Sequence, residues 1–326
     1  MLAEGLDTAA VIRRLESVCR QETPLRQDHR DPNTYLKFEG GGMIYGHKFR
    51  SAAYLLIKAL SAGQRVSHVA DRSSGSWAMG LAWAARVAGA TSSFVTVGDP
   101  HPYIRQFVES VGGCFHVVDN NAARLAKLDE LRSSGIWVPD QHNNVAVIEA
   151  FEKSLGPELA RQFREHQLAP DYLVAPVGTG GLLAGCARYL RAHGAKLTTV
   201  GVDLSSSLVH EGTRHFKYPH AKVRGVGSDD EYCETLITSR EQIDRIVPQS
   251  PFQAWKEMLA LVQEFPCSVG MSGGLALAAA SQLRREVGPD KKIVVILPDR
   301  GETYAEELRA ARLVFGRAPL RFQEGA

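Results

Sequence analysis

A glycine-rich turn between an apolar run and a helical pattern is the feature that most constrains this chain of 326 residues. The stretch Val174-Ala-Pro-Val-Gly-Thr-Gly-Gly-Leu-Leu-Ala-Gly185 begins like a short buried strand and continues like a helix. Glycines allow a tight bend and a close approach of ligand to backbone, and the free N–H groups of a helix start attract anions. Leu183 replaces the third glycine of the dinucleotide pattern G-x-G-x-x-G, and the Walker lysine is absent. The turn therefore favours a small phosphate as ligand, with an empty tight turn as the alternative.

Short apolar runs alternate with helical patterns along the whole chain. Six runs rich in valine and isoleucine predict strands that are buried on both faces. They are Val66–Ala70, Ser93–Val97, Phe115–Val118, Tyr172–Val177, Thr198–Val202 and Lys292–Leu297. Helical patterns lie near 49–62, 75–88, 103–112, 181–193 and 273–287. This alternation predicts an α/β fold of parallel βαβ units, whose ligands bind beyond the carboxyl ends of the strands. A domain boundary is expected near 145–155.

Composition and charge argue against several classes of protein. The net charge is only +2 and no basic stripe carries interleaved aromatic residues, so a nucleic-acid partner is not expected. Apolar runs of membrane-spanning length are lacking, and the charged N-terminus does not look like a signal peptide. The five cysteines are scattered and lack C-x-x-C spacing. We therefore expect reduced thiols, a cytoplasmic location and no metal site.

Lys48 is the first candidate for covalent chemistry. It is expected at the start of a helix, after a loop that contains several glycines. A helix N-terminus is electrostatically unfavourable for a cation, and a lysine of lowered pKa suits Schiff-base chemistry. A solvated surface lysine is the alternative interpretation.

Four further segments carry polar groups at turns. Hydroxyls and N–H groups of the segment Asp71–Ala78 could bind a carboxylate, or Ser73 or Ser74 could simply cap the helix. The segment Gln141–Asn144 offers amide donors, or it is an ordinary polar loop. Gly270–Ala276 is another turn into a helix, in which a serine could be an N-cap, and Ile293–Gly301 is a strand that ends in a polar turn.

The order and spacing of these segments resemble the pyridoxal-phosphate (PLP) enzymes of the tryptophan synthase β-subunit fold (fold type II). Within that family the chain is most similar to the cysteine synthase and cystathionine β-synthase branch. The matching motifs are Glu22-Thr-Pro-Leu25, Glu39 with Lys48 and Arg50, Ser73-Ser-Gly75, Gln141 with Asn144, Gly156-Pro-Glu158, Gly178-Thr-Gly-Gly181, Gly225-Val-Gly227, Ser272, and Leu297-Pro-Asp-Arg-Gly301 with Tyr304. The resemblance covers nearly the whole chain, and it implies two three-layer αβα domains with mostly parallel twisted sheets. One domain would span 36–150, and the other would combine 1–35 with 151–326.

The resemblance also implies roles for individual residues. Lys48 would carry PLP, and the cofactor site would further include Ser76, Gly178, Thr179, Gly180, Gly181 and Ser272. The amino-acid substrate would be bound by Ser73, Ser74, Gly75, Gln141, Gly225 and Arg300. The enzyme would act as a homodimer. It would exchange the β-substituent of an activated L-serine derivative through an aminoacrylate intermediate.

Several departures from the family pattern indicate a specialised substrate. Gly46 stands where the family has a serine two positions before the lysine, and Ser76 replaces the asparagine that bonds the cofactor's 3′-oxygen. Arg300 resembles family members that use O-phosphoserine, because a guanidinium suits phosphate; a surface arginine is the alternative. O-phosphoserine and O-acetylserine both remain open. So do β-elimination, as in a dehydratase, deaminase or desulfhydrase, and a non-catalytic binding protein on the same fold.

Overall fold

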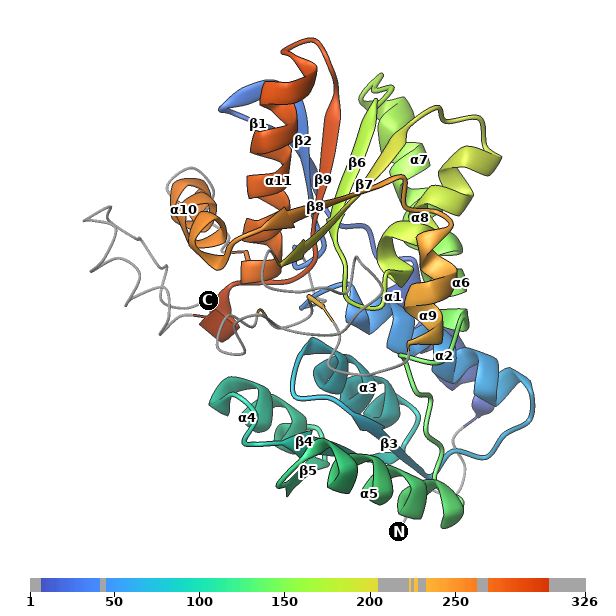
Figure 1. Cartoon of the computed structure of the whole chain (residues 1–326). Helices are drawn as coiled ribbons and strands as arrows, with labels where there is room; N and C mark the ends of the chain where they lie inside the picture. The colour runs from blue at the N-terminus through green and yellow to red at the C-terminus, as the bar shows by residue number, and fades with distance from the viewer. Residues whose placement is uncertain are drawn as a thin grey trace.

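The chain builds two parallel-dominated sheets, each covered by helices, in this computed structural model (Figure 1). The structure describes residues 7–41, 45–204, 223, 226–227, 233–262 and 269–304. The large sheet has the strand order β1-β2-β9-β6-β7-β8. Its strands are β1 (Leu25–Asp28), β2 (Asp31–Phe38), β6 (Tyr172–Pro176), β7 (Thr198–Leu204), β8 (Arg245–Gln249) and β9 (Ile293–Leu297). Only β1 runs antiparallel to its neighbour, so the other five strands end at the same edge.

Helices cover both faces of the large sheet. On one face α11 (Met271–Val287) packs across β6 to β9, and α10 (Pro251–Val262) packs on α11. On the other face α8 (Gly181–Ala192) contacts β6 and β7. Three helices pack around α8: α6 (Ala146–Glu152), α7 (Leu155–Glu165) and α9 (Glu234–Arg240).

The small sheet has the order β3-β4-β5 and is parallel throughout. Its strands are β3 (His68–Arg72), β4 (Thr91–Val97) and β5 (Gly113–Val118). In Figure 1 the helices α3 (Ser76–Val87) and α4 (Pro102–Ser110) lie on one face and α5 (Asn121–Ser133) on the other. The expected α/β fold with two αβα units is therefore confirmed.

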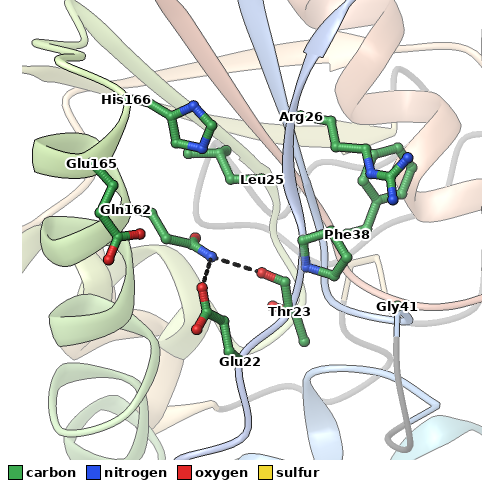
Figure 2. Close-up of a pocket in the computed structure, with 10 residues that line it drawn as sticks. Glu22, Thr23, Leu25, Arg26, Phe38, Gly41, Gln162, Glu165 and His166 are labelled. Carbon is green, nitrogen blue, oxygen red and sulfur yellow. Dashed lines mark hydrogen bonds between the residues drawn. The ribbon is translucent and has the colours of Figure 1, made fainter.

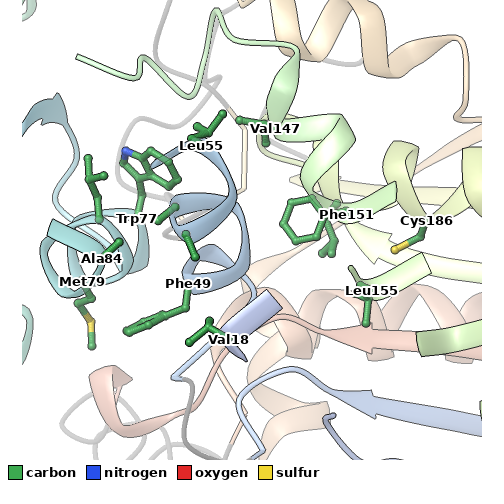
Figure 3. Close-up of a cluster of buried hydrophobic side chains, with 14 of the residues drawn as sticks. Val18, Phe49, Leu55, Trp77, Met79, Ala84, Val147, Phe151, Leu155 and Cys186 are labelled. Carbon is green, nitrogen blue, oxygen red and sulfur yellow. The ribbon is translucent and has the colours of Figure 1, made fainter. Parts of the chain in front are cut away.

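Helix α2 (Lys48–Ser61) joins the two sheets through a shared core. It packs against α3 on one side and α6 on the other, and α1 (Thr8–Cys19) packs against it as well. In Figure 3 the helix α2, which carries Phe49 and Leu55, lies between Trp77 of α3 and Phe151 of α6. These four side chains are between 0% and 3% exposed. The position of Lys48, at the start of α2, is thus set by packing against both halves of the molecule.

All six predicted strands are present, with ends shifted by up to two residues. The sequence analysis did not predict β1, β2 or β8. The proposed domain division stays a prediction. Its boundary between 35 and 36 falls inside β2, which continues from Asp31 to Phe38 in the large sheet.

Candidate active site

The glycine-rich turn connects β6 to α8, as the sequence predicts. Gly180 is the N-cap of α8, has φ +77°, and leaves the helix without a side-chain cap. A Cβ atom at Gly180 would lie 2.5 Å from the Cβ of Ser239, and one at Gly181 would lie 2.8 Å from Cγ1 of Val147. Only glycine therefore fits this turn, whose uncapped N–H groups can bind an anion. The turn fits a cofactor phosphate.

Lys48 begins α2, and its amine is engaged in a polar contact. The Nζ atom donates a hydrogen bond to Oε1 of Gln141 at 2.9 Å and lies 6.0 Å from the ring centroid of Trp77. Burial lowers the pKa of the Lys48 amine to about 8, although Cys233 and Asp71 act in the opposite direction. The main cause is thus desolvation, whereas the sequence argument rested on the helix start. A lysine of this kind is partly neutral near pH 8 and suits nucleophilic attack on a carbonyl group.

One pocket brings most of the predicted cofactor residues together. Lys48, Ser76, Gly178, Thr179, Gly180 and Ser272 line it, with His47, Pro176, Leu182, Pro298 and Asp299. Gly181 follows Gly180 as the first residue of α8. These residues come from α2, α3, α11 and the glycine-rich turn Gly178–Gly181, which is called the phosphate turn below. Elements of both halves of the chain therefore line the pocket. An amine, an anion cradle and a hydroxyl in one pocket suit PLP.

Ser272 does not cap its helix. The N-cap of α11 is Gly270, whereas Ser272 lies in the first turn and its hydroxyl donates to Oδ1 of Asp299 at 3.3 Å. The sequence analysis included Asp299 in the Leu297–Gly301 motif but gave it no role. Because Asp299 lines the same pocket, it is an additional acidic group beside the predicted cofactor site.

The predicted substrate residues are more dispersed. Ser73 and Ser74 lie in the loop before α3 and do not cap it, because the N-cap is Gly75, which lacks a side-chain cap bond. Instead, the N–H of Gly75 donates to Oγ of Ser73 at 3.2 Å. Gln141 is 6% exposed and contacts Lys48, as described above. Gly225 lies outside the described residues.

Arg300 lies beside the pocket, next to Asp299. Its Nε atom donates to the carbonyl oxygen of Gly40, and its guanidinium lies 4.9 Å from the ring centroid of Tyr45. It is not among the residues that line the pocket around Lys48.

A buried ionic network anchors the first turn of α2. Arg50, two residues after Lys48, pairs with Glu39 at 2.8 Å and with Glu158 of α7 at 2.7 Å. Lys37 of β2 pairs with the same Glu158. Arg50, Glu39 and Lys37 are 0% exposed. The network therefore ties the first turn of α2 to β2 and α7.

A second pocket of about 610 Å³ adjoins this network, because two of its lining residues, Thr23 and Gln162, accept hydrogen bonds from Lys37. It is lined by residues 22–26 and by Phe38, Gly41, Gln162, Glu165 and His166. Within it, Gln162 donates to Oε1 of Glu22 at 3.0 Å and to the carbonyl oxygen of Thr23 at 2.9 Å (Figure 2). This pocket contains none of the predicted site residues.

Residues 18–299 match the family model described as "Pyridoxal-phosphate dependent enzyme". The chain belongs to this family. Among curated relatives, it is 28% identical to a cysteine synthase of Staphylococcus aureus (strain N315) over 286 residues, which are 85% of this chain and 89% of that relative. The chain is thus a member of this family that has the tryptophan synthase β-like fold and is distantly related to the cysteine synthase branch, as expected.

The chain also superposes on solved structures that share its fold. O-ureido-L-serine synthase superposes with a TM-score of 0.79 at 21% identity, over 89% of this chain and 92% of that one. O-acetyl serine sulfhydrylase isoform 3 from Entamoeba histolytica gives a TM-score of 0.79 at 23% identity, over 95% and 93%. At these identities the likeness concerns the fold. Within the described residues, none of the helices is long and apolar enough to cross a membrane.

Proposed function

We propose that this PLP-family protein catalyses β-replacement on an activated L-serine derivative, either O-phosphoserine or O-acetylserine. The observation that carries the proposal is the convergence of Lys48, Ser272 and the phosphate turn on one pocket. The family membership and the cysteine synthase relative support a substrate of this class. A homodimer is proposed on the same basis.

The residues present would hold the cofactor at two points. The N–H groups of Gly178–Gly181 would bind its phosphate, and Lys48 would hold its carbonyl carbon. Ser272 would face its pyridine nitrogen with a neutral hydroxyl. When bound, PLP withdraws electrons from the substrate's α-carbon and so eases departure of a β-substituent.

The chain's own groups would then move one proton and orient one carboxylate. Lys48 is partly neutral near pH 8, so its Nζ atom can accept the proton from the α-carbon. The Gln141 amide lies within hydrogen-bonding distance of that amine, where it can also donate to a substrate carboxylate. The N–H groups at the start of α3, next to Ser73–Ser76, would bind the other side of the carboxylate.

The test combines a spectrum with product analysis of the purified full-length protein. Addition of one equivalent of PLP should give the visible absorption band of a lysine-bound cofactor. O-acetylserine or O-phosphoserine supplied with a thiol or amine nucleophile should then yield a new amino acid that contains the nucleophile. Pyruvate and ammonia formed at the same rate without nucleophile would instead establish elimination. Absence of both the band and turnover would indicate a non-catalytic protein.

A further inference from the structure

Asp71 is a buried carboxylate that the proposed chemistry does not use. It is the penultimate residue of β3 and is 0% exposed. Its oxygens accept hydrogen bonds from the backbone N–H of Arg72 at 2.7 Å, the indole N–H of Trp77 at 2.9 Å, and the backbone N–H of Gln141 at 3.4 Å. Burial of an acceptor requires such partners, because an unsatisfied carboxylate inside a protein is strongly destabilising.

Two of these donors, Trp77 and Gln141, belong to residues beside the Lys48 amine. Gln141 accepts the hydrogen bond from Nζ of Lys48 at 2.9 Å, and the Trp77 ring centroid lies 6.0 Å from the same atom. Trp77 directly follows Ser76, which lines the pocket. Asp71 therefore links the start of α3 to the Gln141 segment, and Lys48 lies against both.

We propose that Asp71 is a positioning residue for Lys48, because its carboxylate holds Gln141 and Trp77 around the amine. The role of Lys48 in this statement rests on the proposed function, but the contacts of Asp71 do not depend on it. A precisely held amine is needed wherever lysine attacks a carbonyl and transfers a proton.

The surrounding charges give this proposal a measurable consequence. The titratable groups around Lys48 among the described residues are Asp71 from β3, Cys233 at the start of α9, the adjacent His47, and Asp299, which lines the same pocket. Burial lowers the pKa of Lys48 to about 8, and Asp71 limits that fall. Burial and the nearby Asp140 raise the pKa of Asp71 to about 6, so Asp71 is mostly ionised at pH 8. Removal of its charge should therefore lower the pKa of Lys48 further.

The experiment follows the protonation of Lys48 in full-length protein freed of bound carbonyl compounds with hydroxylamine. Limiting acetic anhydride labels neutral amines, and mass spectrometry gives the labelled fraction of Lys48 against pH, with Lys58 of the same helix as the internal reference. Asp71→Asn should shift the Lys48 titration down by roughly 0.5–1 pH unit, because one charge is lost at nearly constant shape. The control Asp119→Asn removes an exposed carboxylate after β5 and should leave the titration unchanged. Identical Lys48 curves in Asp71→Asn and the wild type would overturn the proposal.

A second variant covers the case in which Asp71→Asn does not fold. Trp77→Phe keeps an aromatic ring but removes the indole N–H that Asp71 accepts, so Asp71 should be harder to ionise. The Lys48 titration should therefore shift to lower pH, by less than in Asp71→Asn. An unchanged titration in Trp77→Phe would count against the proposal. Borohydride reduction of the wild-type protein with PLP separates this inference from the proposed function. Failure to fix PLP on Lys48 would reject the function, whereas an unchanged Lys48 titration rejects only the role of Asp71.

Discussion

The amine of Lys48 donates a hydrogen bond of 2.9 Å to Oε1 of Gln141, a residue 93 positions away in the chain. Lys48 begins α2, whereas Gln141 belongs to the segment between α5 and α6. The contact holds the proposed reactive amine and a proposed carboxylate-binding amide at one place. It also means that a substrate carboxylate bound by Gln141 would lie beside the amine that has to accept its α-proton.

Gln141→Ala should impair substrate binding more than cofactor binding. The alanine removes the amide that would bind the substrate carboxylate, while the phosphate turn and Lys48 remain. We expect KM for O-acetylserine to rise by roughly ten- to a hundredfold, because one hydrogen bond to a charged group contributes about 1.5–3 kcal/mol. Steady-state kinetics and the visible spectrum measure the two effects. Gln64→Ala, an exposed glutamine after α2, is the control. Loss of PLP with unchanged KM in the remaining holoenzyme would contradict this role.

Lys48→Ala should abolish the lysine-bound cofactor band and β-replacement, because Lys48 is the lysine that lines the pocket. Lys58→Ala is a matched control in the same helix, where the lysine pairs with Glu149 at the surface. In the wild type, borohydride-dependent fixation of PLP on Lys48 should increase as pH rises through about 8. That sign follows from the lowered pKa, since only the neutral amine attacks a carbonyl group. A Lys48→Ala protein with full turnover would exclude the assignment.

Gly180→Ala should weaken PLP binding at the phosphate turn. Gly180 has φ +77°, and an added Cβ would lie 2.5 Å from Ser239. Gly194→Ala is a close control, because Gly194 has φ +85° and no atom within 4 Å of an added Cβ. Both variants should lose about 1–2 kcal/mol of stability from backbone strain. Only Gly180→Ala should also raise the Kd for PLP at least tenfold in a spectroscopic titration. Equal Kd values in the two variants would place the phosphate site elsewhere.

The sequence predicted the strands and turns that a short stretch of residues determines by itself. Buried parallel strands read as valine-rich runs, so β6, β7 and β9 were found close to their true bounds. The phosphate turn was also predictable, because its glycines lie between a strand and a helix. The strand β2 was not predicted, since Lys37 within it and Glu39 just after it are charged residues that normally indicate exposure. The structure buries both through Arg50 and Glu158, partners that a single sequence does not identify.

The sequence likewise predicted some features of the candidate site and not others. Motif spacing indicated Lys48, Ser76 and Ser272, and one pocket contains all three. The spacing did not indicate that Ser272 donates to Asp299, or that Asp71 accepts from Trp77. The Ser272–Asp299 contact depends on how α11 packs against β9. The Asp71–Trp77 contact spans only six residues, but it depends on side-chain orientations that motif spacing does not give.

Glu39→Gln should destabilise the protein strongly at neutral pH. Burial alone would raise the pKa of Glu39, but Arg50 and Lys37 hold it below its ordinary value. A depressed carboxyl pKa adds stability above the pKa of the unfolded state, and that stability is lost as pH falls through the folded-state pKa. Removal of one partner from a buried ion pair costs about 3–5 kcal/mol. Urea unfolding should show this loss at pH 7 and a smaller one in acid. Glu149→Gln, which breaks the surface pair with Lys58, should cost less than about 1 kcal/mol. Equal losses in both variants would contradict the importance of the buried network.

Arg300→Ser should reduce turnover of O-phosphoserine selectively. Arg300 directly follows Pro298 and Asp299, which line the pocket, and its guanidinium is already oriented by Gly40 and the Tyr45 ring. A guanidinium held in this way could pair with a leaving phosphate without a large loss of side-chain entropy. Wild-type enzyme should therefore prefer O-phosphoserine to O-acetylserine. Loss of one charge-assisted contact should lower kcat/KM for O-phosphoserine by roughly ten- to a hundredfold and leave O-acetylserine nearly unchanged. An equal loss of kcat/KM on both substrates would instead mean that Arg300 only supports the Tyr45 segment before Lys48. A wild-type preference for O-acetylserine would exclude phosphate as the leaving group.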